Sequence, residues 1–281
     1  FYRSGYSTIV RESRDFSCVI VTPDGRLLVS PWMFFHSPVY YHLVKKVKEI
    51  YGDENLVDGD VFVTNHPYEG NMPHASDMGF IAPIFYEKKL VAFVATIAHK
   101  ADVGGTVPGS TYGSATELYH EGMMLPPIRI HSAGKPVEDI FRLISANTRA
   151  PYVVLGDISG QIGVTRIGGK HIKEMCRQFG PEIVLEAMEA MITASGQEFS
   201  SALKGIPDGT SEATGFLDHD GVDVSQKIKL HVKIINKNGK LNFDFTGCDP
   251  ETPGPVNLRI AMVEACVYYC LIGLVDSNLR Y

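Results

Sequence analysis

Residues 74–99 read HASDMGFIAPIFYEKKLVAFVATIAH, and this stretch determines the centre of the expected fold. Two apolar runs, 80–85 and 90–98, lie on either side of the polar segment Glu87-Lys88-Lys89. Apolar runs of this length, bounded by a turn signal, predict the two strands of a buried hairpin. Residue 88, midway between Asp77 and His99, is the centre of the expected turn. Symmetric pairing would therefore place Asp77 opposite His99 at the open end, with Cβ atoms roughly 5 Å apart.

The open end of this hairpin carries side chains that bind metals. His74 lies three residues before Asp77, so it can fold over the same end. Two imidazoles and one carboxylate suit Zn²⁺, Mn²⁺ or Fe²⁺, and three protein ligands leave positions open for water or substrate. The alternative is a local turn formed by His74 and Asp77, with His99 as a hydrogen-bonded core histidine. Spacing alone does not choose between these two interpretations.

Other polar residues around this stretch are weaker candidates. His36, His66 and His120 are each better explained as polar loop or helix residues than as metal ligands. Asp102 follows His99 by three residues, which makes it a candidate either to orient a ligand histidine or to act as a base. A solvated loop carboxylate is the competing explanation for Asp102.

The rest of the chain predicts an α+β fold with segregated regions. Expected strands lie at 16–21, 27–29 and 61–64, and expected helices at 40–51, 137–146, 153–178 and 181–204. A further hairpin, 227–235 with 241–245, turns at Asn238-Gly239, and a buried helix at about 258–275 follows. We thus expect mixed sheets with hairpins in the N-terminal half, a helical middle, and a hairpin and buried helix at the C-terminal end. Residues 1–135 form a β-rich region with the metal site, and 136–281 a helical and mixed α/β region.

Composition and missing motifs exclude several classes of function. The net charge of −6 argues against nucleic acid as a partner, and the apolar stretch 260–275 is too short to span a membrane. Five cysteines without a CxxC pair favour a reducing, cytoplasmic setting. No P-loop, GxGxxG or GxSxG motif occurs, so we expect no nucleotide-binding residues in this chain and no serine hydrolase of that type. The first residue is not Met, and we expect the natural protein to continue past residue 281.

Several motifs, taken together, resemble the hydantoinase B family. They are Glu12-Ser13-Arg14-Asp15-Phe16-Ser17, Asn65-His66-Pro67-Tyr68, His74-Ala75-Ser76-Asp77, Ala98-His99-Lys100-Ala101-Asp102-Val103-Gly104-Gly105, Glu121-Gly122-Met123-Met124-Leu125-Pro126-Pro127, Ala146-Asn147-Thr148-Arg149, Gly156-Asp157, Asp244-Phe245-Thr246-Gly247 and Gly254-Pro255-Val256-Asn257. This family contains partner subunits of ATP-dependent hydantoinases, oxoprolinases and caprolactamases, and of acetone and acetophenone carboxylases. Its members are considerably longer than this chain.

The resemblance carries site residues with it. The family's metal-binding pattern, His-x-x-Asp and a later His, falls on His74, Asp77 and His99 at matching spacing. Asn65, His66 and Glu121 become candidate substrate-binding residues. One departure is that His66 stands where the family usually has Asp, in an Asn-Asp-Pro-Tyr motif.

The activity implied by the resemblance is ATP-dependent hydrolysis of a cyclic amide such as a hydantoin, 5-oxoproline or a lactam. A hydantoinase A-type partner would bind ATP and Mg²⁺ and phosphorylate the amide oxygen, and a water on a Zn²⁺, Mn²⁺ or Fe²⁺ ion here would attack. The small-molecule substrate would therefore be processed by a hetero-oligomer. One alternative is an ATP-dependent ketone carboxylase, and another is a non-catalytic scaffold subunit.

Overall fold

The fold is built on one large sheet, a column of helices and a smaller sheet. The computed structural model describes residues 1–31 and 33–275. The strands are β1 Phe16–Val21, β2 Val61–Thr64, β3 Asp77–Tyr86, β4 Lys89–His99, β5 Ile128–Ser132, β6 Lys135–Pro136, β7 Gly209–Leu217, β8 Ile228–Lys237 and β9 Lys240–Asp244. The α-helices are α1 Ser37–Tyr51, α2 Glu138–Ala146, α3 Pro151–Phe179, α4 Pro181–Leu203 and α5 Ile260–Val275.

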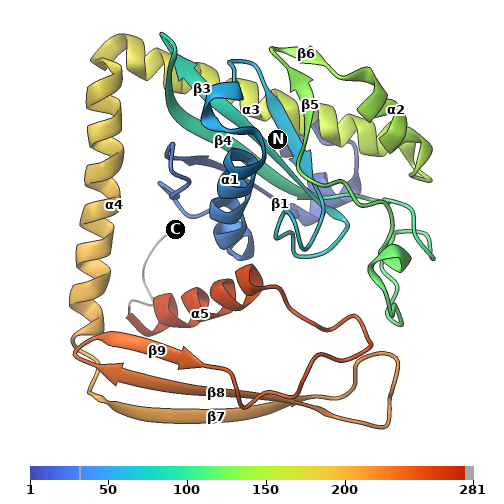
Figure 1. Cartoon of the computed structure of the whole chain (residues 1–281), viewed down its shortest axis with the longest axis vertical. Coiled ribbons are helices and arrows are strands. Elements are labelled where there is room, and N and C mark those ends of the chain that lie inside the picture. Colours follow the sequence, from blue (N-terminus) through green and yellow to red (C-terminus); the bar gives the residue numbers. More distant parts are fainter. Residues whose placement is uncertain (32, 276–281) are drawn as a thin grey trace.

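The first six strands form a single antiparallel sheet in the order β1-β4-β3-β2-β5-β6. Helix α1 covers one face of this sheet and α3 the other (Figure 1). Because β3 and β4 are buried on both faces, their side chains belong alternately to two cores. Phe80 and Val94 lie in the core on the α3 side, whereas Phe93 and Ile97 lie in the core on the α1 side.

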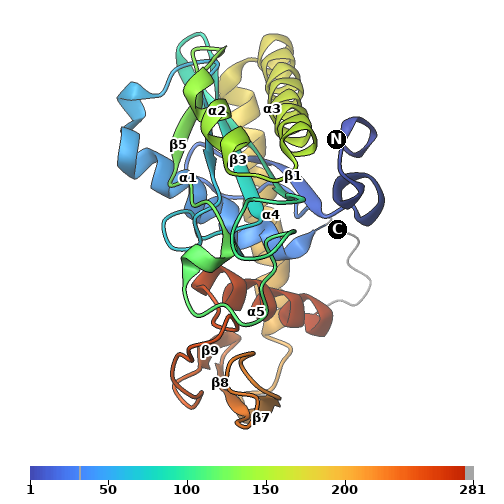
Figure 2. The same cartoon turned by 90° about the vertical axis from the view of Figure 1, so that its right-hand side faces the viewer.

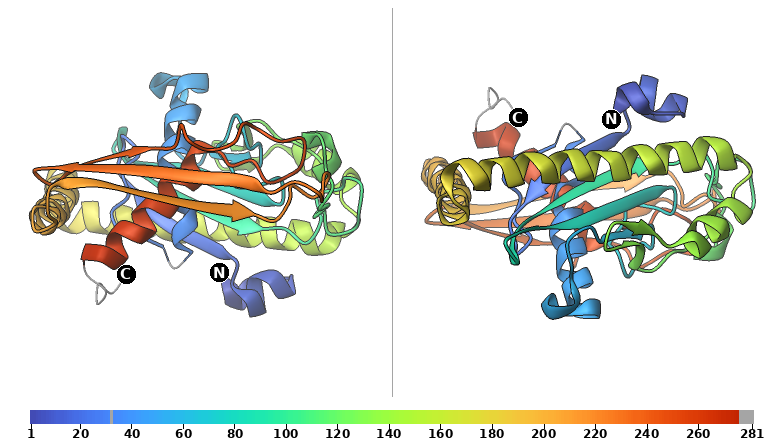
Figure 3. Two further views of the ribbon diagram at one scale, coloured as in Figure 1. Left: turned by 90° about the horizontal axis from the view of Figure 1, so that it is seen from below. Right: turned by 90° about the horizontal axis from the view of Figure 1, so that it is seen from above.

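Helix α3 approaches the sheet closely through two glycines. A Cβ on Gly168 would lie 2.8 Å from a methyl carbon of Val94, and one on Gly169 would lie 2.7 Å from Ile84. These distances are shorter than real Cβ contacts, so the helix axis reaches the sheet only because both positions lack a side chain. Seen from above, α3 runs along the length of the large sheet (Figure 3, right).

The second half of the chain leads away from this sheet. Helix α4 extends as a column from the end of α3 to the three-stranded sheet β7-β8-β9 (Figures 1 and 2). Helix α5 lies between the two sheets, where it packs against α1, and crosses behind the small sheet when seen from below (Figure 3, left). The small sheet is only partly covered, because every residue of β7 is exposed.

The hairpin register places Asp77 directly opposite His99, as the sequence predicted. The turn is shorter than expected, because Lys89 already belongs to β4 and only Glu87 and Lys88 lie outside the strands. Continuing that two-residue turn without interruption would pair Asp77 with Ala98. A bulge corrects this: Ile84 pairs with Ala92 and Phe85 with Leu90, so Val91 has no partner. The extra residue shifts the register by one position and restores the predicted pair.

The α+β class and its order of elements are confirmed. Strand β7 was not predicted, because its sequence, Gly209–Leu217, has weak strand propensity and no apolar alternation. The helix at 260–275 is present, but only Ala261 and Ala265 on it are buried, so its expected burial is incomplete. Its uniformly apolar sequence indicated burial without saying which side is covered. The division at residue 135 stays a prediction, and 276–281 lie outside the described residues.

The first prediction concerns the hairpin turn. Glu87 and Lys88 both have positive φ, 48° and 72°, which costs a non-glycine residue about 1 kcal/mol. Replacing the pair by Asn-Gly should raise the free energy of unfolding by about 1 kcal/mol in denaturant titration. Metal content should stay unchanged because the bulge at Val91 sets the register. A changed metal content would show that the turn itself sets it.

Candidate metal centre

Three side chains meet at the open end of the β3–β4 hairpin. Nε2 of His74 lies 3.2 Å from Oδ2 of Asp77, and Nδ1 of His99 lies 3.6 Å from Oδ1. The two imidazole rings have their centroids 4.9 Å apart. One ligand atom from each of the three residues lies within 4.8 Å of the others, which is the arrangement of a cation site. The structure therefore brings together the three predicted ligands.

The carboxylate of Asp77 is the electrostatic centre of this group. Asp77 is 3% exposed. Burial alone would raise the pKa of Asp77, but the surrounding imidazoles of His36, His74 and His99 hold it well below its usual range. Burial likewise opposes protonation of His74, yet the hydrogen bond and charge of Asp77 outweigh it and raise the His74 pKa. Asp77 is thus an ionised ligand at neutral pH.

The donor set fits a divalent transition metal. Oδ1 of Asp77 is buried and has no hydrogen-bond partner, although a buried carboxylate oxygen normally has one. Two imidazole nitrogens and a carboxylate oxygen are the donors that Zn²⁺ and Mn²⁺ accept. A cation held by His74, Asp77 and His99 would satisfy this unpaired oxygen.

Two further donors, Asp15 and His36, lie at the same end of the sheet. Oδ2 of Asp15 is 3.8 Å from Nδ1 of His99, and Nε2 of His36 is 3.7 Å from Oδ2 of Asp77. Asp15 was not predicted at this site, and His36 was expected as a polar loop or helix residue, whereas it is 3% exposed. The available signal for Asp15 was its place directly before β1, which pairs with β4 so that Phe16 lies opposite Ala98.

A polar clamp supports the hairpin behind the metal ligands. The buried Lys100 donates from Nζ to the carbonyl of Ala98 and to Oε1 of Gln161, at 3.1 and 2.5 Å. Gln161, on α3, donates in turn to the carbonyl of Met78 at 3.1 Å. Met78 and Ala98 are the register pair next to Asp77 and His99. Burial lowers the pKa of Lys100 to about 8.

Comparison with known proteins identifies the family. All of the chain, residues 1–281, matches the family described as Hydantoinase B/oxoprolinase. The chain belongs to this family. A Pseudomonas sp. (strain NS671) protein named as the B component of a D-/L-hydantoinase is 33% identical over 98% of this chain, and 5-oxoprolinase 1 of Arabidopsis thaliana is 31% identical over 99%. The chain spans 48% and 24% of the lengths of these two relatives.

Solved structures of this family share the fold. An ATP-dependent caprolactamase from Pseudomonas jessenii superposes with a TM-score of 0.85 at 24% identity, covering 95% of this chain and 46% of the other. A nucleotide-free acetone carboxylase gives 0.87 at 16% identity, covering 99% and 38%. At these identities the match establishes the fold alone.

The candidate substrate residues fall into two groups. Asn65 is fully buried, and its side chain donates to the carbonyls of Ala75 and Met123 and accepts from the N–H of Leu125. It therefore ties the loops around the metal centre together. Glu121, by contrast, is partly exposed, and its charge raises the pKa of His74, so it lies beside the candidate metal ligands.

His66, the departure from the usual family motif, caps its own turn. Its Nδ1 accepts the backbone N–H groups of Tyr68 and Glu69, each at 3.2 Å. An Asp side chain makes the same kind of local bond in an Asx-turn, so the histidine can replace it there. Nδ1 is thus an acceptor and Nε2 carries the proton. The roles of Asn65, His66 and Glu121 toward a substrate stay predictions.

Asp102 organises the loop that follows His99. Its carboxylate accepts the backbone N–H groups of Gly104, Gly109 and Arg149, at 3.0, 3.0 and 2.8 Å, and the Arg149 guanidinium at 3.0 Å. These bonds occupy both oxygens, which favours a structural role. The function of Asp102 as a base or as a partner of a ligand histidine stays a prediction.

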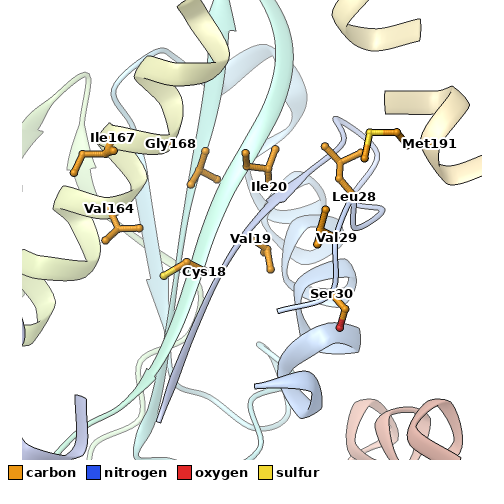
Figure 4. A pocket seen from close by; sticks show the side chains of 11 residues that line it. Cys18, Val19, Ile20, Leu28, Val29, Ser30, Val164, Ile167, Gly168 and Met191 are labelled. Atoms are coloured by element: carbon orange, nitrogen blue, oxygen red, sulfur yellow. The ribbon is translucent and has the colours of Figure 1, made fainter. Parts of the chain in front are cut away.

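A cavity of about 440 Å³ lies elsewhere, between β1, α3 and α4 (Figure 4). Apolar side chains such as Ile20, Val164 and Met191 line it, and none of the candidate metal ligands does. Cys18 faces it, and burial raises the pKa of that thiol to about 11. This cavity therefore offers shape but no reactive group.

The second prediction tests Asp102. Burial opposes its ionisation, but the four donors outweigh it and lower its pKa below 3.8. Its stabilising contribution is therefore complete above that pH and is lost as the pH falls through the folded-state pKa. Asp102→Asn should lower the free energy of unfolding by about 2 kcal/mol at pH 7.

Denaturant titration at several pH values provides the measurement. The difference between parent and Asp102→Asn should shrink below pH 3.8. Asp139→Asn, which removes an exposed partner of Arg142, is the control and should change little. Equal effects of the two substitutions would contradict the structural role of Asp102.

Proposed function

We propose that this chain is the metal-bearing part of an ATP-dependent enzyme that hydrolyses a cyclic amide, of the hydantoin, 5-oxoproline or lactam type. The observation that carries this proposal is the buried, unpaired Oδ1 of Asp77 between His74 and His99. It occurs in a chain of the hydantoinase B/oxoprolinase family. The relatives' names, which include a D-/L-hydantoinase component and the beta chain of a caprolactamase, support the class of substrate.

The ring carbonyl of a cyclic amide is a poor electrophile, so the reaction needs activation on both sides. A bound Zn²⁺, Mn²⁺ or Fe²⁺ would supply Lewis-acid activation of water or of a carbonyl oxygen. Asp77 contributes the negative charge that holds the cation, while His74 and His99 contribute neutral donors. Glu121 lies close enough to His74 to accept or release a proton beside them.

ATP would act through a partner. We infer a hydantoinase A-type subunit that binds ATP and Mg²⁺ and phosphorylates the amide oxygen, because no P-loop occurs in this sequence. Relatives named as one of several subunits, such as the beta chain of the Pseudomonas jessenii caprolactamase, support a hetero-oligomer. In the described residues no helix has both the length and the apolar character needed to cross a membrane. The five free cysteines support a cytoplasmic location.

Ketone carboxylation is a second candidate, favoured by two comparisons. The acetophenone carboxylase delta subunit of Aromatoleum aromaticum is 29% identical over 86% of this chain, and acetone carboxylase shares the fold. The same ligands would then stabilise enolate or carboxylate oxygens. A scaffold subunit that binds no metal is the third candidate, although the turn cap made by His66 removes the feature that favoured it.

The third prediction is measured by elemental analysis of the purified full-length protein. The parent should hold one equivalent of Zn²⁺ or Mn²⁺, and His74→Ala, Asp77→Asn and His99→Ala should each lose at least nine-tenths of it. His171→Ala, an exposed histidine on α3, is the matched control and should retain the metal. A parent that stays metal-free after incubation with both ions would leave the scaffold candidate in first place.

The fourth prediction separates the two reactions. With the ATP-binding partner present, ATP consumption should depend on a cyclic amide and be independent of bicarbonate, and His99→Ala should reduce it at least a hundredfold. Dependence on both a ketone and bicarbonate would instead establish the carboxylase. Unchanged turnover of a metal-free His99→Ala protein would exclude a catalytic role for this centre.

A further inference from the structure

We infer that His36 is a positioning residue for Asp77, held in one tautomer by a buried hydrogen-bond chain that runs from Tyr40 through Ser17. This inference rests on the proposed metal centre and concerns a residue outside its three predicted ligands. His36 would direct one carboxylate oxygen of Asp77 and leave the other for the cation.

The chain of hydrogen bonds joins three elements of the fold. Oγ of Ser17, on β1, lies 2.7 Å from Nδ1 of His36, which ends the short helix before α1. The same oxygen is hydrogen-bonded to the hydroxyl of Tyr40 on α1. Tyr40, Ser17 and His36 are 0%, 2% and 3% exposed, so bulk water does not compete for these bonds.

The donors in this chain can be ordered. Tyr40 also has a hydrogen bond with the backbone of Ile97 that lowers the pKa of the phenol, as a donated N–H does. The phenol hydrogen is then free to be donated to Ser17, and the Ser17 hydroxyl to Nδ1 of His36. A neutral imidazole that accepts at one nitrogen carries its proton on the other. His36 therefore presents an N–H at Nε2.

That N–H faces the metal ligand Asp77. Nε2 of His36 lies 3.7 Å from Oδ2 of Asp77, slightly beyond hydrogen-bond length. His74 also approaches Oδ2, whereas Oδ1 is the oxygen without a hydrogen-bond partner. The two imidazoles thus attract one oxygen of the carboxylate and leave the other available. The reverse order of donors would set the Nε2 lone pair against the carboxylate, which is repulsive.

A competing role exists for His36, because it also lies within cation-binding range of Asp15 and Asp77. As a ligand of a second cation, His36 would need a lone pair at Nε2 and would donate from Nδ1 to Ser17. The two roles predict different metal stoichiometries and different responses to loss of Ser17.

The test uses the purified full-length protein and Zn²⁺, with affinity measured by competition against a chelating indicator. The parent should bind one equivalent. Ser17→Ala and His36→Leu should each weaken binding by tenfold to a hundredfold, the usual effect of losing a group that orients a ligand. His36→Gln, which can place an N–H near the Nε2 position, should stay within about threefold of the parent. Thr165→Val removes a buried hydroxyl on α3 and should leave affinity unchanged.

The double variant Ser17→Ala/His36→Leu should bind no more weakly than His36→Leu alone, because both changes interrupt one path. Additive losses, or undisturbed affinity in variants that melt cooperatively without metal, would overturn the inference. Two equivalents in the parent falling to one in both His36 variants would assign a second cation instead. A metal-free parent would refute the proposed centre itself, and the inference with it.

Discussion

The pairing of Asp77 with His99 is the constraint on which the candidate site depends. Strand side chains alternate between faces, so a slip of one residue would turn every side chain of β4 to the opposite core. Two devices fix the register: the bulge at Val91, and the clamp of Gln161 and Lys100 on the neighbouring pair, Met78 and Ala98. The geometry of the metal centre is therefore set by backbone pairing before any cation is present.

Much of the fold could be predicted from the sequence. The β3–β4 hairpin and the helices α3 and α4 have long apolar patterns and clear punctuation, such as Gly180-Pro181 between the two helices. The register was also predictable, although the prediction used a turn centred on residue 88. The actual turn and the bulge at Val91 compensate each other, and neither leaves a signal in the apolar pattern.

The site was predictable only where its residues belong to one local unit. His74, Asp77 and His99 lie on a single hairpin, so spacing could bring them together. Asp15 and His36 come from segments whose place depends on β1 pairing with β4 and on α1 packing over the sheet. That information is tertiary. His66 shows the reverse case, since the departure from the family motif suggested a changed site, while its local hydrogen bonds preserve the turn.

The glycines of α3 bear on the order in which the protein folds. Gly168 and Gly169 give close contact with Val94 and Ile84, yet each glycine inside a helix costs about 1 kcal/mol relative to alanine. Helix α3 is thus a weak autonomous helix, and the paired strands act as the template on which it becomes stable. Since Gln161 on this helix holds the hairpin in register, ligand geometry and helix docking mature together. A cation captured at the far end of the hairpin would then report on, and stabilise, the cooperative assembly of the whole sheet-and-helix unit.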